Sequence, residues 1–399
     1  MVVTRRLLLV ISTALALVMT TAAPMLGAYG PSQPDPIVQQ DLLRVHDIAV
    51  VGKTAGVGPV VAVGWRQAVK PGELFVAFSI NGGRSYLKKN GTMREFRVAG
   101  EGTRGLSLDI CGGRIWVGTV VNYPGDDPSD KDVLLTSRTM SGDAGQAFLT
   151  DAAADRTVRS VSVACVGNRL LAVAWLESSF GKPRAKLMLR SLEPLGEPTS
   201  VRRIFGLGEA QLKGGIAVDA STESVHVAWT AGKKLNILYE GFLVGAGPDP
   251  VITRRSSVKL AAGDALHPQV ASRGQEVVIA FSQAGKVKAR VSGDGGAIFG
   301  EPSVVVGTGS RAAPSEALSV DISGPRIVVE ASASSGGVIT PQRISSNDTG
   351  ATWDARSFGH VGARVGALRK TSPTSSLLVE AWQNNDSGLD TIRGQFERE

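Results

Sequence analysis

The hydrophobic positions of the chain recur as short apolar runs, most of which end in an aromatic residue. The runs end at Trp65, Thr119, Trp175, Trp229, Phe281, Ala331 and Trp382. Subtracting neighbouring positions gives intervals of 54, 56, 54, 52, 50 and 51 residues. Repeats of this length are typical of four-stranded units that bury their hydrophobic faces against their neighbours. The pattern therefore predicts seven similar β units.

Other alternating segments flank each run and predict three further strands per unit. First strands lie upstream of the runs, as at residues 106–111, 161–165 and 317–322. A third strand follows each run, and a fourth comes after a turn, as at 301–306. Alternation with a period of two places every second side chain on one face of a sheet. We expect each unit to be a four-stranded antiparallel sheet.

The two ends of the chain complement each other in this scheme. The last unit stops after its third strand at residues 391–399, whereas residues 37–43 form a strand without a partner before the first unit. Pairing these two segments would cover an exposed sheet edge. The predicted fold is an all-β, seven-bladed β-propeller whose N-terminal strand closes the last blade. Six blades plus an irregular unit is the alternative.

Four segments share the turn pattern Ser-x-Asp/Asn-x-Gly-x-x-aromatic. The Asp or Asn side chain can accept hydrogen bonds from N–H groups of its own turn, and the Gly supplies a positive φ. We expect the final aromatic ring to pack under the hairpin. The positions are Ser79, Asn81, Gly83 and Tyr86; Ser141, Asp143, Gly145 and Phe148; Ser292, Asp294, Gly296 and Phe299; and Ser346, Asp348, Gly350 and Trp353.

This turn resembles the Asp-box, or BNR repeat, of the sialidase-like β-propellers. The match is full at residues 346–353 and looser elsewhere, since Asn81 replaces Asp and Tyr86, Phe148 and Phe299 replace Trp. The resemblance covers nearly the whole chain as architecture. It implies that the boxes are folding devices on the face opposite the ligand, so their aspartates are not catalytic candidates.

Composition fits one large β domain over residues 37–399. The chain of 399 residues is 43% hydrophobic and contains 48 glycines, which suits many turns. Its net charge of +7 favours anionic partners, but no Lys/Arg-rich run indicates nucleic acid binding. Nothing in the sequence calls for a cofactor.

The N-terminus has the pattern of an export signal. Arg5 and Arg6 precede an apolar stretch at 7–19, and small residues at 21–23 offer a cleavage site. We expect a signal peptide at 1–23, a Pro-rich flexible lead-in at 24–36, and a secreted or extracytoplasmic protein. The apolar stretch is short for a membrane span of about 20 residues, although an uncleaved anchor is the alternative.

Both cysteines occupy matching places at the ends of first strands. Cys111 and Cys165 fall in neighbouring units of an exported chain, which predicts an interblade disulfide. The alternative is a pair of buried thiols too far apart to join.

The resemblance places the ligand face at the loops joining second to third strands and those joining consecutive blades. That face then includes residues 122–131, 177–184 and 383–388. Asp126, Asp127, Asp130 and Asp132 could bind Ca²⁺ as hard oxygen ligands, but they lack the spacing of an EF-hand. We therefore expect a solvated acidic loop and no metal, with a Ca²⁺ site as the alternative. Basic residues and a histidine at the starts of first strands form a candidate anion site: Arg104, Arg159, Lys213, His267 and Arg364. The alternative is that each pairs with a nearby carboxylate.

A catalytic set is much harder to find. The resemblance implies an Arg-Ile-Pro motif, an arginine clamp, a general acid and a Tyr nucleophile activated by Glu in an active sialidase. The sequence has no such motif near the first unit, and Tyr123 with Glu177 is the weak candidate pair. We therefore expect a non-catalytic Asp-box propeller that binds an extracellular, anionic glycan or protein. The alternative is an exo-acting glycoside hydrolase of the sialidase type.

Overall fold

The computed structural model describes the chain from residue 36 to 398 with gaps. The described residues are 36–42, 45–55, 58–67, 73–81, 86, 94–99, 104–122, 131–149, 156–193, 195, 202–247, 250–306, 318–323, 325–335, 338–357, 364–370, 377–384 and 390–398. All belong to the unit Asp35–Glu399. The predicted signal peptide and almost all of the predicted lead-in lie outside these residues.

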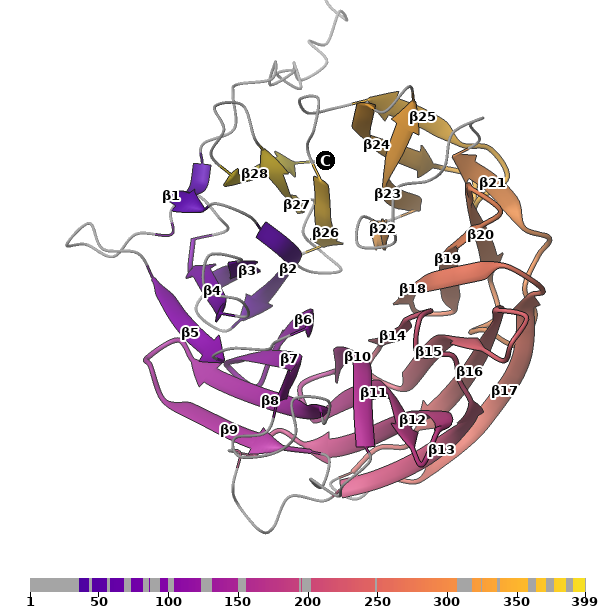
Figure 1. Ribbon diagram of the computed structural model, residues 1–399, viewed down its shortest axis with the longest axis horizontal. Coiled ribbons are helices and arrows are strands. Elements are labelled where there is room, and N and C mark those ends of the chain that lie inside the picture. The colour runs from indigo at the N-terminus through magenta and orange to yellow at the C-terminus, as the bar shows by residue number, and fades with distance from the viewer. Residues whose placement is uncertain are drawn as a thin grey trace, which may run out of the picture. The chain divides into compact units, whose positions relative to one another are not determined.

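The described strands form antiparallel sheets of four, drawn in Figure 1. The first two groups consist of β2 (Val45–Ala55), β3 (Gly58–Gln67), β4 (Glu73–Ser79) and β5 (Glu95–Ala99), and of β6 (Arg104–Cys111), β7 (Arg114–Asn122), β8 (Lys131–Thr139) and β9 (Ala144–Phe148). The next two consist of β10 (Arg156–Val166), β11 (Leu170–Ser179), β12 (Lys182–Ser191) and β13 (Arg202–Glu209), and of β14 (Ile216–Ala220), β15 (Ser224–Ala231), β16 (Asn236–Val244) and β17 (Ile252–Ala261).

Three more groups complete the described strands. They are β18 (Ala265–Arg273), β19 (Glu276–Gln283), β20 (Lys286–Ser292) and β21 (Ser303–Val306); β22 (Leu318–Ser323), β23 (Arg326–Ser335), β24 (Val338–Ser346) and β25 (Asp354–Ser357); and β26 (Arg364–Lys370), β27 (Leu377–Asn384), β28 (Asp390–Arg398) and β1 (Pro36–Leu42). A single parallel pair, Thr157 with Lys131, joins the second and third groups into one eight-stranded sheet. The expectation of four-stranded antiparallel sheets is confirmed.

The apolar runs of the sequence are the second strands, because these strands are buried on both faces. In β11, Val173 and Trp175 pack in a cluster with the preceding sheet, whereas Ala174 and Leu176 pack in a cluster with the following one. Each described hydrophobic cluster lies between two successive sheets in this way. A strand covered on both sides has no polar face, so it reads as a continuous hydrophobic run.

Side chains on the first strands accept hydrogen bonds from the first strand of the next sheet. Ser107 Oγ accepts the N–H of Val163 at 2.9 Å, and Ser162 Oγ accepts that of Val218 at 3.1 Å. Asp219 Oδ2 in turn accepts the N–H of Ser272 at 2.6 Å. These bonds fix the register between sheets that otherwise meet through hydrophobic side chains.

The N-terminal strand is part of the last sheet. β1 pairs antiparallel with β28 in the order β1-β28-β27-β26. This strand begins at Pro36 and ends at Leu42, one residue before the predicted range of 37–43 at each end. β26 of the same sheet contacts both β2 and β22. The pairing of the two chain ends is therefore as the sequence predicted.

Many first strands contain a one-residue register shift near their start. In β10 the shift falls between Val158 and Ser160, which makes Arg159 the extra residue. Similar shifts occur near the starts of β2, β6, β18 and β26. Such β-bulges re-aim the side chains that they carry and are common beside binding sites.

Candidate ligand-binding rim

Short connections at one end of three successive sheets are linked by hydrogen bonds into a continuous rim. We define the basic rim as residues 179–182, 210–215, 231–236, 262–265 and 283–286, which join second to third strands or one sheet to the next. The N–H of Gln211 donates to Thr230 O at 2.9 Å, and that of Asp264 donates to Lys234 O at 3.0 Å. Gln283 Nε2 donates to Gly263 O at 2.9 Å. Hydrogen bonds therefore hold the connections from 210 to 286 in place, and the N–H of Ala210 donates to Pro183 O at 3.2 Å, next to the connection at 179–182.

The basic rim carries an excess of exposed positive charge. Its described, solvent-exposed cations are Lys182, Lys213, Lys233, Lys234 and Lys286. The exposed carboxylates within or directly beside the same ranges are Asp264 and Glu209. Rigid loops with one dominant sign of charge attract ligands of the opposite sign. This arrangement can hold carboxylate, sulfate or phosphate groups.

The predicted anion-site residues differ in where they lie relative to the basic rim. His267 lies beside the rim, and its N–H donates to Gly214 O at 2.6 Å, which brings it next to the exposed Lys213. Arg159 is exposed at the bulge of β10. Arg104 and Arg364 are the first residues of β6 and β26, and their side chains lie outside the described part.

His267 is neutral at neutral pH, so it adds no positive charge to the predicted anion site. Burial lowers the pKa of its imidazole from 6.5 to about 4. The residue also has a left-handed φ of 55° within the irregular start of β18. A neutral imidazole can still exchange a hydrogen bond with a ligand, but it adds no charge to the site.

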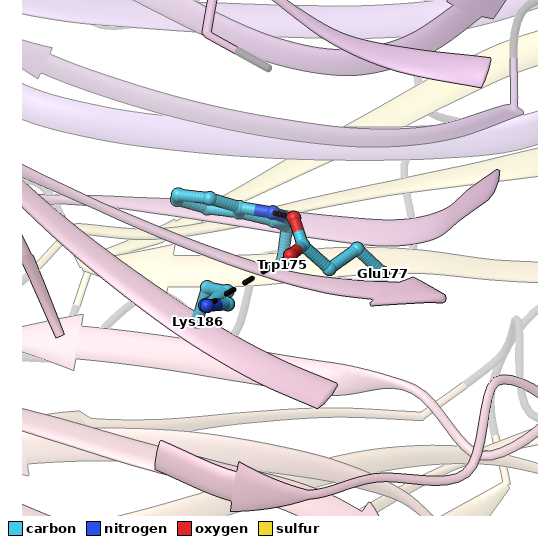
Figure 2. Close-up of polar contacts among 3 residues, drawn as sticks. All are labelled: Trp175, Glu177 and Lys186. Carbon is cyan, nitrogen blue, oxygen red and sulfur yellow. Dashed lines mark hydrogen bonds and ion pairs between the residues drawn. The ribbon is translucent and has the colours of Figure 1, made fainter. Parts of the chain in front are cut away.

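Glu177, one of the weak catalytic candidates, makes structural contacts with Trp175 and Lys186. Figure 2 shows its carboxylate beside Trp175, whose Nε1–H donates to Glu177 Oε2 at 2.7 Å. Its other oxygen lies 3.9 Å from Lys186 Nζ, and the residue is 8% exposed. Tyr123 lies outside the described residues, so the proposed pair is not seen together. Within the part described, Glu177 secures a core tryptophan.

The acidic loop predicted at 122–131 ends earlier than expected. Asp132 lies in strand β8 and is 3% exposed, which corrects its placement in a solvated loop. Lys131 Nζ donates to Asn122 Oδ1 across the two strand ends. Asp126, Asp127 and Asp130 lie outside the described residues. Among the residues that the structure describes, no three His, Cys, Asp or Glu side chains come close enough to hold a metal ion.

The third and fourth turn motifs have the same hydrogen-bond geometry. Ser292 Oγ donates to Asp294 Oδ1 at 2.7 Å, and Ser346 Oγ donates to Asp348 Oδ1 at 2.7 Å. The serine oxygens accept the N–H groups of Gly296 and Gly350 at 2.9 and 2.8 Å. Both motifs join the third strand of a sheet to its fourth, away from the connections that form the rim. Hydrogen bonding explains the serine and aspartate without any catalytic role.

The first motif keeps only part of this pattern in the described residues. Ser79 Oγ donates to Asn81 Oδ1 at 2.6 Å, and Tyr86 is buried with 6% exposure. Gly83 lies outside the described residues. The serine and the aromatic residue therefore behave as in the two fuller motifs.

The second motif is not a full box, which corrects the expectation for residues 141–148. Thr139 replaces Ser141 as the turn acceptor, because Thr139 Oγ1 accepts the N–H of Asp143 at 2.9 Å. Strand β9 then starts at once and includes Gly145. Phe148 ends that strand and is 37% exposed, whereas Tyr86 of the first motif is 6% exposed. The hydroxyl of Thr139, two residues before the motif, therefore accepts the turn hydrogen bond, and the turn is shorter than the motif predicts.

Cys111 and Cys165 form a disulfide between β6 and β10. Their Cα atoms lie 6.1 Å apart, and both residues are buried. The bond joins two successive sheets at matching points of their first strands.

Two features of the structure had little signal in the sequence. His226 lies in a buried chain, with Nδ1 2.7 Å from Tyr239 Oη and Nε2 2.8 Å from Ser224 Oγ. Phe180 stands at the tip of the β11–β12 hairpin and is 78% exposed. The dipeptide Phe180-Gly181 between two strands is the one sign of this exposure that the sequence offers.

Comparison with known proteins finds similarity to β-propellers. No family model matches the chain, and no curated protein does. The six-bladed, fucose-recognising lectin of Aleuria aurantia is 12% identical, with 79% of this chain and 95% of the lectin covered and a TM-score of 0.48. The Cps50 (Swd1) β-propeller domain of Myceliophteria thermophila is 14% identical over 87% and 96%, with a TM-score of 0.49.

An enzyme is also among the similar structures. The sialidase of Trypanosoma rangeli in complex with sialic acid is 11% identical, with a TM-score of 0.39. The similarity covers 77% of this chain and 56% of the sialidase. Within the described part of the present chain, no helix has the length and hydropathy needed to cross a membrane.

Proposed function

We propose that residues 37–399 form an exported, seven-bladed Asp-box propeller that binds an anionic extracellular glycan or protein through the basic rim, without catalysis. Seven four-stranded groups among the described residues support the blade count. The pairing of β1 with β28, and the contact of β26 with β2, support closure of the ring by the chain ends. Residues 1–23 serve as the export signal in this proposal.

The observation that carries the proposal is the charge of the basic rim. Its exposed lysines come from connections of three successive sheets, so a long anion can contact several of them at once. The connections are short and hydrogen-bonded to each other, which keeps the charges at fixed spacing. A bound anion therefore requires little ordering of the protein.

The state of the described tyrosines and acidic residues supports a non-catalytic role. Burial raises the pKa of both Tyr86 and Tyr239, so these phenols stay protonated. Glu240 pairs with Arg254 at 3.1 Å, and Glu330 lies 3.7 Å from Arg343. Glu177 and Glu240 therefore have structural partners. Burial raises the pKa of Glu330 to about 8, and at 0% exposure this residue does not reach a ligand.

A binding experiment tests this function. Immobilised heparin, at graded salt, should retain the wild-type protein, and the double variant Lys233→Glu/Lys234→Glu should lose about tenfold in affinity at low salt. The control Lys259→Glu, on the exposed strand β17 and outside the connections, is compared with the single variant Lys233→Glu, which changes the net charge by the same amount. Equal loss in the control, or no binding to any polyanion, would count against the proposal.

An activity assay tests the absence of catalysis. A fluorogenic sialoside should not be turned over by the wild-type protein. Turnover that disappears in Tyr123→Phe would replace this proposal with a sialidase.

A further inference from the structure

The tip of the β11–β12 hairpin holds an aromatic residue where the turn favours a small polar one. Ser179 pairs with Lys182, so Phe180 and Gly181 form a two-residue connection. Their φ values are 51° and 70°, as a type I′ turn requires at both central positions. Asn-Gly is the preferred dipeptide for this turn, because a bulky side chain is strained at positive φ.

Phe180 is unfavourable for stability in a second way. Its side chain is 78% exposed, so the phenyl ring stays in water and gains nothing from the core. Among the described residues, the ring contacts no other aromatic or cationic side chain. The matching hairpin between β19 and β20 uses Ala284 at the same turn position, with φ 50°, followed by Gly285 at 74°. The fold therefore accepts a small residue at this place.

Backbone strain and exposure at one residue indicate a role in contact with a partner. The surroundings of Phe180 limit the chemistry of that partner. Lys182 follows two residues later on the same hairpin and is exposed, and the basic rim continues into the next two sheets. A ligand that fits needs an apolar face for the phenyl ring and acidic groups for the lysines.

We propose that Phe180 stacks against a sugar ring of an acidic polysaccharide whose acidic groups lie along Lys182 and the other lysines of the basic rim. The C–H face of a pyranose offers the flat apolar surface that an aromatic ring packs against, while each sugar acid supplies a negative charge at regular spacing. This inference rests on the proposed function and narrows its ligand to one class.

A lipid surface fits these observations less well. Phe180 is the sole exposed large hydrophobic residue among the described residues of the rim. Stable membrane anchoring needs more buried apolar surface than one phenyl ring provides. A polysaccharide needs one ring for stacking and several cations, which is what the rim presents.

The test compares Phe180→Asn with Val251→Asn, which replaces another highly exposed apolar side chain that lies outside the basic rim. The probes are polygalacturonate, poly-L-glutamate and vesicles of phosphatidylserine and phosphatidylcholine, with binding measured by calorimetry or sedimentation. Phe180→Asn should lower affinity for polygalacturonate about tenfold and leave binding to poly-L-glutamate unchanged. Val251→Asn should change neither, and Phe180→Trp should keep the wild-type affinity.

Thermal unfolding tests whether Phe180→Asn loses affinity because the variant unfolds. Replacing Phe180 with Asn relieves turn strain, so the unfolding temperature should stay unchanged or rise. Equal binding of polygalacturonate by wild type and Phe180→Asn would overturn the inference while leaving a polyanion-binding rim intact. Vesicle binding that depends on Phe180 would also overturn it. Failure of every polyanion to bind would instead remove the proposed function itself.

Discussion

The carboxylate of Asp109 accepts the backbone N–H of Cys165 at 2.6 Å, across the boundary between two sheets. Its other oxygen accepts the N–H of Ile110 at 2.7 Å, and the residue is 1% exposed. The same Cys165 is bonded to Cys111, two residues after Asp109. One buried carboxylate and one covalent bond therefore hold the same pair of first strands together.

Replacing Asp109 with Asn should destabilise the fold. The amide group of Asn would turn an N–H toward one of the two backbone donors, which loses a hydrogen bond in a buried place. We expect a loss of about 1–3 kcal/mol in the free energy of unfolding, measured by urea denaturation. Asp264→Asn, which changes an exposed carboxylate, is the control and should have no effect on stability. Equal stability of the two variants would contradict the role given to Asp109.

Removing the disulfide should also destabilise the fold. The bond closes a loop with a sequence separation of 54, and it limits the freedom of the unfolded chain. The double variant Cys111→Ser/Cys165→Ser should lose about 2–4 kcal/mol. The readout is the urea midpoint with and without reductant: wild type should shift on reduction and the variant should not. Combining the variant with Asp109→Asn should give a non-additive loss, because both act on Cys165.

The glycine of the third motif should tolerate alanine far less well than that of the second. A Cβ on Gly296 would lie 1.8 Å from Tyr239 Oη, and its φ is 82°. A Cβ on Gly145 would lie 3.2 Å from Leu195 Cβ. We expect Gly296→Ala to cost at least about 2 kcal/mol and Gly145→Ala much less, as measured by thermal unfolding. Similar losses would mean that both segments are full boxes.

Stability should fall between pH 6.5 and about 4 because His226 is buried in its neutral form. Burial lowers the pKa of His226 from 6.5 to about 4. The unfolded state therefore binds a proton in this range that the folded state does not, and protonation favours unfolding as the pH falls. His226→Gln should flatten the decline in the urea midpoint across this range. Because burial lowers the pKa of His267 similarly, His267→Gln is needed to separate the two contributions.

Those parts of the fold that depend on hydrophobic patterning were predictable from sequence. Trp175 and Trp229 mark second strands because a strand buried on both faces must be apolar throughout. The pairing of β1 with β28 followed from two segments that each lacked a partner. Both predictions use only the period of the pattern and the need to cover sheet edges.

Details that depend on register and local hydrogen bonds were not predictable. Thr139 lies just before the second motif, and the sequence pattern gives no sign that its hydroxyl replaces that of Ser141. The contact of His226 with Tyr239 requires the exact offset of β15 against β16. At the site, Lys213 is the one predicted anion-site residue that lies within the basic rim, and the sequence did not single out Lys233, Lys234 or Lys286. It also gave little reason to expect a hydrophobic residue as exposed as Phe180.

The pairing of β1 with β28 also sets an order of events during folding. The last sheet combines the earliest described strand with the latest, so it cannot be completed until β28 has been synthesised. Contacts between residues so distant in sequence form slowly, and the edges of β1 and β27 stay open for pairing with other chains in the meantime. Nascent or truncated chains are therefore the species in which we expect aggregation to begin.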